Sequence, residues 1–363
     1  MKSDRSISSN VAETLIDWSR VKRVLLIRLR SIGDTVLMTP CLQALNDWKP
    51  SVEISVVSEE SAASILEGHP LIYQLFVTGK ELTARLSLVS RLRRRAFDLA
   101  FNLHGGTTAM FMTAMSGAKH TFGFRGQRAS WLLNNRAPGP DRLLKRETVH
   151  SVEQQLALLN FAGVPIPEQP RLRLSIDPGA SARARAKLIA AGLTAASLAS
   201  ERFAIVAAGA AFESKRWGTR GFAAVVDHLH SRWKLKSVII AGPGQERLAA
   251  EVAGFSNSNP YVLCEISIAE LKAVVGTFGR VFVGNDSGPM HIAAALECPV
   301  VAVFGSSNPD VWRPWTSAPC RVLGGERGTP DSNVRGSIGR VEADEVIAAV
   351  DEVLAVAATH AAS

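Results

Sequence analysis

Two charged side chains follow apolar runs at positions where open parallel sheets place their functional groups. Asp34 comes shortly after residues 24–27, and Lys215 follows residues 203–207 through a turn that contains glycine. Ligands of such sheets bind beyond the carboxyl ends of the strands. A carboxylate at such an end can act as a general base, and a lysine can neutralise a leaving diphosphate. These two residues are therefore the candidate catalytic groups.

Each of these residues also has a purely structural interpretation. Ser31 and Asp34 have the spacing of a capping box, so Asp34 either acts as a base or only stabilises the start of a helix. Ser214, Lys215 and Arg216 belong to a polar loop that either wraps a phosphate or is an exposed basic loop. The residues alone leave both alternatives open.

A third candidate is the segment 281–295, which is typical of a buried strand, a sharp polar turn and the start of a helix. Asp286 and Ser287 are natural N-cap residues, and Gly288 permits close approach of the backbone. Free N–H groups and the positive end of the helix dipole favour a bound phosphate. His291 falls about one turn into the same helix. The alternative is a well-capped strand–helix unit without a ligand.

Other polar residues are weaker candidates. Glu246 follows the glycines of residues 242–244, and it either accepts hydrogen bonds from ribose hydroxyls or is a first-turn acid. His104 ends a strand of the first half and either faces an acceptor or has a structural role. The basic run at residues 91–95 either faces an acceptor or lipid or is a solvated helix face. It contains Arg91, Arg93, Arg94 and Arg95.

Several common nucleotide motifs are missing. No GxxxxGK[ST] phosphate loop occurs, and residues 242–247 begin like a GxGxxG fingerprint but end in Arg247. A P-loop kinase and a dehydrogenase are therefore disfavoured. No Asp-x-Asp pair occurs either, so the usual carboxylates for a metal on a sugar-nucleotide diphosphate are lacking. We expect no metal site and a diphosphate that is neutralised by helix ends and basic side chains.

Length, charge and cysteine usage narrow the class of protein. The chain has 363 residues, 47% of them hydrophobic, and a net charge of +8, which favours an anionic partner. Nucleic acid, an acidic membrane surface and a phosphorylated substrate all fit, although no nucleic-acid module is recognisable. The cysteines, at 41, 264, 298 and 320, have no metal-binding spacing and are expected to be isolated thiols. Without a recognisable signal peptide or spanning segment, we expect a cytoplasmic protein, peripheral to a membrane.

Apolar runs alternate with amphipathic segments, which predicts an α/β fold with a parallel sheet in each half. A proline-rich segment at residues 164–170 suits a linker. We expect domains over residues 1–172 and 173–342, and a terminal helix within 343–363 that packs back toward the first domain. The expected strands are residues 24–27, 52–57, 75–77, 97–102, 119–124, 203–207, 237–240, 281–283 and 300–304. The expected helices include residues 61–66, 82–95, 151–161, 181–191, 219–229, 245–252, 268–275, 289–296 and 343–358.

Three segments in this order resemble the bacterial heptosyltransferase family, glycosyltransferase family 9. The first is residues 30–40, which run Arg-Ser-Ile-Gly-Asp-Thr-Val-Leu-Met-Thr-Pro. The second is the lysine-bearing loop Ser-Lys-Arg-Trp at residues 214–217. The third is Gly-Asn-Asp-Ser-Gly-Pro-Met-His at residues 284–291, followed by residues 293–295 and 303–305. The resemblance extends from residue 24 to about residue 315.

The resemblance implies a GT-B fold, with two Rossmann-like domains whose parallel sheets face an interdomain cleft. It implies inverting, metal-independent heptose transfer from ADP-L-glycero-β-D-manno-heptose to the lipopolysaccharide inner core, with no cofactor. The family's base matches Asp34 and its diphosphate-binding lysine matches Lys215. A ribose-binding acid matches Glu246. The matching donor-binding residues also include Ser214, Asp286, Ser287, Gly288 and His291. Ser287 stands where some members have threonine, and both residues carry a hydroxyl.

Alternatives of other classes remain. The chain could be a GT-B enzyme that uses a UDP- or GDP-sugar, or a sugar-nucleotide epimerase. It could also be a non-catalytic protein that binds a nucleotide or phosphosugar, which would need the Lys215 and Asp286 loops but not Asp34. The expected partners are a nucleotide-sugar donor, a lipopolysaccharide core or lipid A acceptor, and the anionic inner membrane. A monomer is the default oligomeric state.

Overall fold

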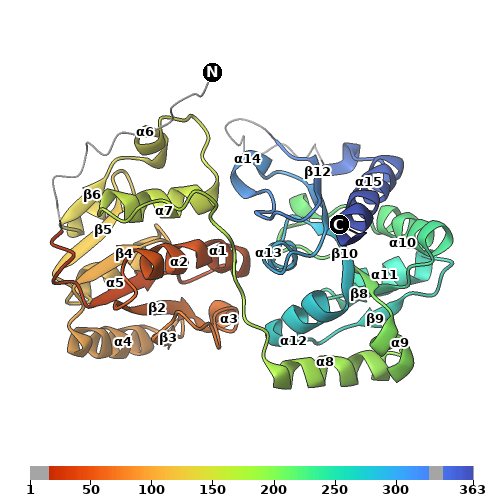
Figure 1. Cartoon of the computed structure of the whole chain (residues 1–363), viewed down its shortest axis with the longest axis horizontal. Coiled ribbons are helices and arrows are strands. Elements are labelled where there is room, and N and C mark those ends of the chain that lie inside the picture. Colours follow the sequence, from red (N-terminus) through yellow and green to blue (C-terminus); the bar gives the residue numbers. More distant parts are fainter. Residues whose placement is uncertain (1–15, 327–337, 363) are drawn as a thin grey trace. The chain divides into compact units, whose positions relative to one another are not determined.

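The apolar runs of each half of the chain form a parallel sheet of six strands (Figure 1). The computed structural model describes residues 16–326 and 338–362. The strand order is β3-β2-β1-β4-β5-β6 in the first sheet and β12-β11-β10-β7-β8-β9 in the second. In both sheets the chain leaves the first strand in two directions, which is the doubly wound order of the Rossmann fold. The expected α/β class is confirmed.

The strands of the first sheet are mostly short and buried. Their bounds are β1 Arg23–Ile27, β2 Glu53–Glu59, β3 Gln74–Thr78, β4 Leu99–Asn102, β5 His120–Phe124 and β6 Asn135–Ala137. The second sheet consists of β7 Phe203–Ala207, β8 Ser237–Ile240, β9 Tyr261–Leu263, β10 Gly279–Asn285, β11 Val300–Phe304 and β12 Cys320–Gly324. The edge strands β6, β9 and β12 were not expected, because each is short or only partly buried.

Helices connect the strands as crossovers, as parallel pairing requires. In the first half they are α1 Ile32–Leu37, α2 Thr39–Trp48, α3 Glu60–Ala63, α4 Leu82–Arg95, α5 Thr107–Met115, η1 Ser130–Leu132, α6 Pro140–Leu144 and α7 Ser151–Phe161. The second half has α8 Pro178–Ala190, α9 Ala195–Ser200, η2 Glu213–Lys215, α10 Thr219–Trp233, α11 Glu246–Phe255, α12 Ile268–Ala273, η3 Val274–Phe278, α13 Gly288–Ala295, α14 Pro309–Trp312, η4 Ile338–Arg340 and α15 Ala343–Ala362. Segments η1, η2 and η4 are single 3-10 turns, and η3 is a π-helical turn that continues α12.

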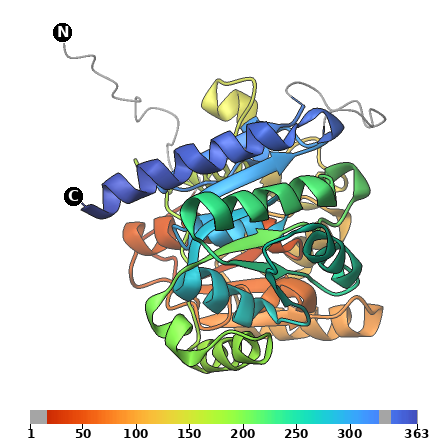
Figure 2. The same ribbon diagram turned by 90° about the vertical axis from the view of Figure 1, so that its right-hand side faces the viewer.

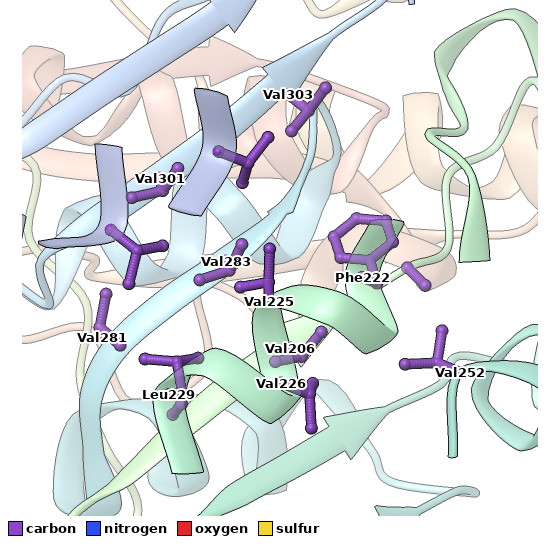
Figure 3. Close-up of a cluster of buried hydrophobic side chains, with 14 of the residues drawn as sticks. Val206, Phe222, Val225, Val226, Leu229, Val252, Val281, Val283, Val301 and Val303 are labelled. Atoms are coloured by element: carbon purple, nitrogen blue, oxygen red, sulfur yellow. The ribbon is translucent and has the colours of Figure 1, made fainter. Parts of the chain in front are cut away.

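Valine side chains from the second sheet form a core with α10 and α15 (Figure 3). Phe222 and Leu229 on α10 and Val301 on β11 are fully buried in it. Helix α15 contributes Val350 and Leu354 to the same core and lies beside α10 (Figure 2). The terminal helix therefore packs on the second sheet. Its apolar face fits the strands β11 and β12.

The chain divides into two units that are not continuous in sequence. The second unit contains Arg171–Ser363 together with Arg30–Thr39 and Ser61–Pro70, and the first unit contains the remainder. The continuous part of the second unit begins at Arg171, next to the boundary that we expected between residues 172 and 173. The two inserted segments were not expected from the sequence. Helix α1 therefore belongs to the same unit as α13, although it follows the first strand of the other sheet.

The second inserted segment is held by a buried lysine. Lys272 on α12 is 1% exposed, and its Nζ donates to the carbonyls of Ser64 at 3.1 Å and Ile65 at 3.2 Å. Burial lowers the pKa of Lys272, and the nearby Glu67 opposes that effect. Two hydrogen bonds from one ammonium offset part of the cost of burying it. The lysine thus fixes residues 61–70 to the second unit.

His69, in the same segment, makes the stability of the protein depend on pH. Burial lowers its pKa to about 4, and the charges of Lys272 and Arg173 add to that effect against a backbone hydrogen bond to Arg173. A histidine of the unfolded chain has a pKa of about 6.5, so the unfolded state binds more protons between pH ~6.5 and ~4. We therefore expect the free energy of unfolding to fall by up to about 3 kcal/mol as the pH decreases through this window.

Chemical denaturation at several pH values tests this expectation. His69→Asn is the matched control, because asparagine stays neutral throughout the window. The variant should lose part of the pH dependence even if it is less stable at every pH. Equal pH slopes in the two proteins would show that His69 is not the group responsible.

Candidate functional site

The candidate site lies at the carboxyl ends of β7, β10 and β11. The strand order of the second sheet reverses between β7 and β10. Strand β10 pairs with β7 on one side and with β11 on the other. Asn285, the last residue of β10, is fully buried and donates from Nδ2 to the carbonyl of Ala208 at 2.7 Å. Its Oδ1 accepts from the backbone N–H of Trp217 at 3.0 Å. One amide thus holds both ends of the loop that carries Lys215.

Lys215 and Asp286 form an ion pair in this region. The Nζ–Oδ2 distance is 2.7 Å, and the side chains of Lys215 and Asp286 are 27% and 4% exposed. Asp286 is anchored by its own N–H, which donates to the carbonyl of Val303. An ammonium has three N–H donors and this pair uses one of them. The lysine is therefore positioned in advance with donors left for an anion.

The lysine loop rests directly on the backbone that follows β11. A Cβ at Gly305 would lie 2.0 Å from the carbonyl oxygen of Ser214, a distance that no real side chain tolerates. The hydroxyls of Ser214 and Ser306 lie 3.1 Å apart, within hydrogen-bond distance. Glycine at position 305 is thus required by this close approach. The structure brings Ser214 to the site through its backbone and its hydroxyl.

The start of α13 forms the third part of the site. Ser287 is the N-cap residue, with extended φ and ψ of −154° and 170°, and its Oγ donates to the carbonyl of Asn285 at 3.2 Å. Of the two residues considered for the cap, Asp286 instead pairs with Lys215. Gly288 and Pro289 begin the helix. The free N–H groups at such a helix start favour an anion.

His291 lies in the first turn of this helix and contacts α1. It is 4% exposed, and its Nδ1 has no hydrogen-bond partner within the described part of the chain. Burial lowers its pKa, which Asp286 and Asp34 raise and Lys215 lowers. The imidazole is therefore neutral at pH 7 and lies close to all three charged groups. A Cβ at Gly33 would be 2.5 Å from the Cδ2 of His291, so glycine lets α1 pack against the ring.

Asp34 is the third residue of α1 and forms the capping box that the sequence indicates. Its Oδ2 accepts from the N–H of Ser31 at 3.4 Å and from the hydroxyl of Ser31 at 3.1 Å. The side chain is half-buried. The structural alternative for Asp34 is thus realised, and it is compatible with a second role because both use the ionised carboxylate.

A pocket of about 270 Å³ adjoins the start of α13. This volume is close to the lower end for small-molecule sites, which is roughly 300 Å³. Most of its lining is apolar. It includes Ile32, Gly209, Ala210, Ile240, Gln245, Ile266, Ile268, Leu271, Ser287 and Gly288. The arrangement offers an apolar pocket beside a helix start whose free N–H groups favour an anion.

Glu246 follows the pocket residue Gln245 but does not line the pocket itself. Its Oε1 accepts from the N–H of Gly244 at 3.0 Å, and the residue is exposed. His104 lies in the first unit, after β4, where its backbone N–H donates to Oδ1 of Asn102 at 3.1 Å. Glu246 thus lies outside the pocket lining, and His104 belongs to the first unit, whereas Lys215 and Asp286 belong to the second.

No role was predicted for Asn285, although it lies within residues 284–291 of the third matching segment. A polar residue at the end of a buried strand was the available signal.

In the described residues 16–326 and 338–362, no three His, Cys, Asp or Glu side chains are grouped to hold a metal ion. No helix described there is long and apolar enough to cross a membrane. Burial raises the pKa of the Cys298 thiol to about 12 and that of Cys320 to about 11.

Comparison with known proteins gives consistent results. Residues 85–338 match the family described as glycosyltransferase family 9 (heptosyltransferase). An Escherichia coli protein named lipopolysaccharide heptosyltransferase 3 is 27% identical over 345 residues, which cover 90% of this chain and 97% of the relative.

Solved structures show the same fold. A glycosyltransferase family 9 protein from Veillonella parvula DSM 2008 has a TM-score of 0.80 at 23% identity, covering 92% of this chain and 98% of that one. The E. coli ADP-heptose lipopolysaccharide heptosyltransferase II has a TM-score of 0.75 at 22% identity, covering 92% and 99%. The fold expected from the sequence, GT-B with two Rossmann-like sheets, is confirmed.

Proposed function

The chain belongs to glycosyltransferase family 9, and from this membership we propose that it transfers heptose from an ADP-activated donor to the lipopolysaccharide inner core. The names of its relatives support the sugar and the acceptor. The membership makes it a glycosyltransferase, and the finer assignment of donor and acceptor is our proposal. The proposed donor is ADP-L-glycero-β-D-manno-heptose, and no cofactor or metal takes part in this scheme.

The proposal rests on one observation. Helix α1 packs on α13, which brings both Asp34 and the Lys215–Asp286 pair close to His291. A base and an anion-binding group are needed together for displacement at an anomeric carbon. The apolar pocket beside Ser287 and Gly288 offers space for the nucleobase of a nucleotide. A protein that only binds a nucleotide would use this carboxylate only as the cap of α1.

The proposed reaction is an in-line displacement with inversion. An acceptor hydroxyl oxygen attacks the anomeric carbon while Asp34 takes its proton, and the bond from that carbon to the diphosphate oxygen breaks. Lys215 and the N–H groups around Ser287 and Gly288 stabilise the negative charge that develops on the departing ADP. Glu246 is the proposed ribose contact, and Ser214, Asp286 and His291 hold these groups in place.

Release of ADP from ADP-heptose tests the proposal. We expect release that depends on a heptose-deficient lipopolysaccharide acceptor and persists in EDTA. UDP- and GDP-sugars in the same assay should give little release. Turnover with one of those donors would favour the alternative GT-B enzyme or epimerase. Tight binding of ADP without any turnover would favour a non-catalytic nucleotide-binding protein.

The proposed acceptor is anchored in a membrane by its lipid A part. We therefore also propose that the protein is cytoplasmic, peripheral to the inner membrane, and works as a monomer. The net charge of +8 supports contact with an anionic surface.

A further inference from the structure

The positive charge of the chain is concentrated in one stretch of the first unit. Residues 82–140 contain nine Lys and Arg residues and one acidic residue, Asp98. Asp98 is 7% exposed and its Oδ1 accepts from Lys119 Nζ at 2.7 Å. The carboxylate thus neutralises one lysine, and Glu59 and Glu53 from outside the stretch pair with Arg85 and Arg95.

Two helices of this stretch cover the same face of the first sheet. Leu88 and Leu92 of α4 and Ala109 and Met112 of α5 belong to one buried core cluster with Phe76 of β3. The helices lie side by side, since they contact each other and Arg85 of α4 bonds to Thr108 of α5 (Figure 1). Their opposite sides therefore face outward together.

These outward sides carry large apolar groups. Leu82 and Leu86 of α4 are 70% and 54% exposed, and Phe111 and Met115 of α5 are 47% and 42% exposed. Helix α5 contains no charged residue. Trp131 in η1, which contacts α5, is 73% exposed. We call these five residues and the elements that carry them the α4–α5–η1 face.

Arginines are exposed on these elements or next to them. Arg91, Arg93 and Arg94 are exposed on α4, and Arg125 and Arg128 are exposed just before η1. Single exposed apolar residues are ordinary, but a group on adjoining elements marks an interaction surface. Aromatic and aliphatic groups flanked by arginine are typical of segments that lie in a membrane interface, where cations also meet anionic headgroups.

We propose that the α4–α5–η1 face docks the protein on an anionic phospholipid surface. Trp131, Phe111 and the α4 leucines enter the boundary between headgroups and acyl chains, while the arginines bind lipid phosphates. Charge complementarity selects anionic lipid, and the uncharged outer side of α5 argues against a nucleic-acid backbone as the occupant. The inference rests on the proposed function for its purpose, because the proposed acceptor is embedded in a membrane.

Partitioning of the whole protein onto lipid vesicles tests this inference without any sugar substrate, so its failure is separate from failure of heptose transfer. We expect binding to phosphatidylglycerol-containing vesicles, weak binding to phosphatidylcholine vesicles, and loss of binding as salt rises. Each cation near an anionic surface contributes roughly fivefold to partitioning. The triple variant Arg91→Gln, Arg93→Gln and Arg94→Gln should therefore bind about 10²-fold less.

Matched controls change the same chemistry in the second unit. The triple variant Arg202→Gln, Arg232→Gln and Arg340→Gln removes three exposed cations elsewhere and should bind nearly as well as the unchanged protein. For the apolar part, Phe111→Ser with Trp131→Ser should weaken binding at least tenfold.

The corresponding apolar control is Ile189→Ser with Val356→Ser, whose residues are 44% and 38% exposed. This pair should leave vesicle binding unchanged. If the test and control variants lose vesicle binding equally, the binding does not depend on this face, and its assignment is overturned. No binding to anionic vesicles at low salt, or tighter binding to a DNA duplex than to vesicles, would overturn the proposal itself.

Discussion

Replacing Asp34 by asparagine should lower turnover by roughly 10²–10⁴-fold and should leave the affinity for ADP nearly unchanged. The amide cannot take the proton of the acceptor hydroxyl. Its Oδ1 can still accept the hydrogen bonds that Ser31 donates to the carboxylate, so the start of α1 is preserved. Steady-state kinetics with a titration of ADP binding measures both quantities on the same protein.

Ser31→Ala separates the two roles of the carboxylate. This variant removes the hydroxyl bond to Asp34 but keeps the charge, so it should cost about 1 kcal/mol of stability and retain most of the turnover. If Asp34→Asn keeps normal turnover in a folded protein, the carboxylate is only a cap. If Ser31→Ala loses as much turnover as Asp34→Asn, positioning of α1 and not proton transfer explains the effect.

Replacing Lys215 by methionine should lower both donor affinity and turnover, by about 10²–10³-fold in kcat/KM. The variant also leaves the buried carboxylate of Asp286 without its ion pair. Loss of one partner from a buried pair costs about 3–5 kcal/mol, and the 27% exposure of Lys215 places this case at the lower end or below. Activity and thermal stability should therefore fall together.

A double variant, Lys215→Met with Asp286→Asn, distinguishes binding from folding. It removes both charges, so most of the lost stability should return. Donor affinity should stay low, because no ammonium faces the diphosphate. Isothermal titration with ADP and a thermal melt of the three proteins give the comparison. Wild-type affinity in the double variant would show that Lys215 does not bind the diphosphate.

Local patterns were sufficient for the central elements of the fold. Helix α4 and strands β7 and β11 begin and end where the sequence predicts, because each is a clear periodic or apolar run. Helix α5 was missed, since it has no polar face and starts from Gly106 without a side-chain cap. The edge strands β6, β9 and β12 were missed because each is short or only partly buried and gives no apolar run.

The motifs contain Lys215, Asp286 and His291, but they do not reveal which residues these side chains contact. The pairing of Lys215 with Asp286 joins residues that are far apart in sequence, and so does the contact of Gly305 with Ser214. The grouping of α1 with α13 depends on Gly33 fitting against His291. Such contacts follow from tertiary packing, which a single sequence does not reveal.

Because the second unit is discontinuous in sequence, its folding depends on the order of translation, and proteolytic cleavage between the units would divide it. Helix α1 leaves the ribosome long before α13, so one wall of the pocket, Ile32, must wait for the rest of its unit to be translated. Cleavage at the proline-rich segment 164–170 would yield a carboxyl-terminal fragment without Ile32, which packs against Gly288. Such a fragment would expose the surface that α1 covers on α13 to water, and its pocket would lack one wall.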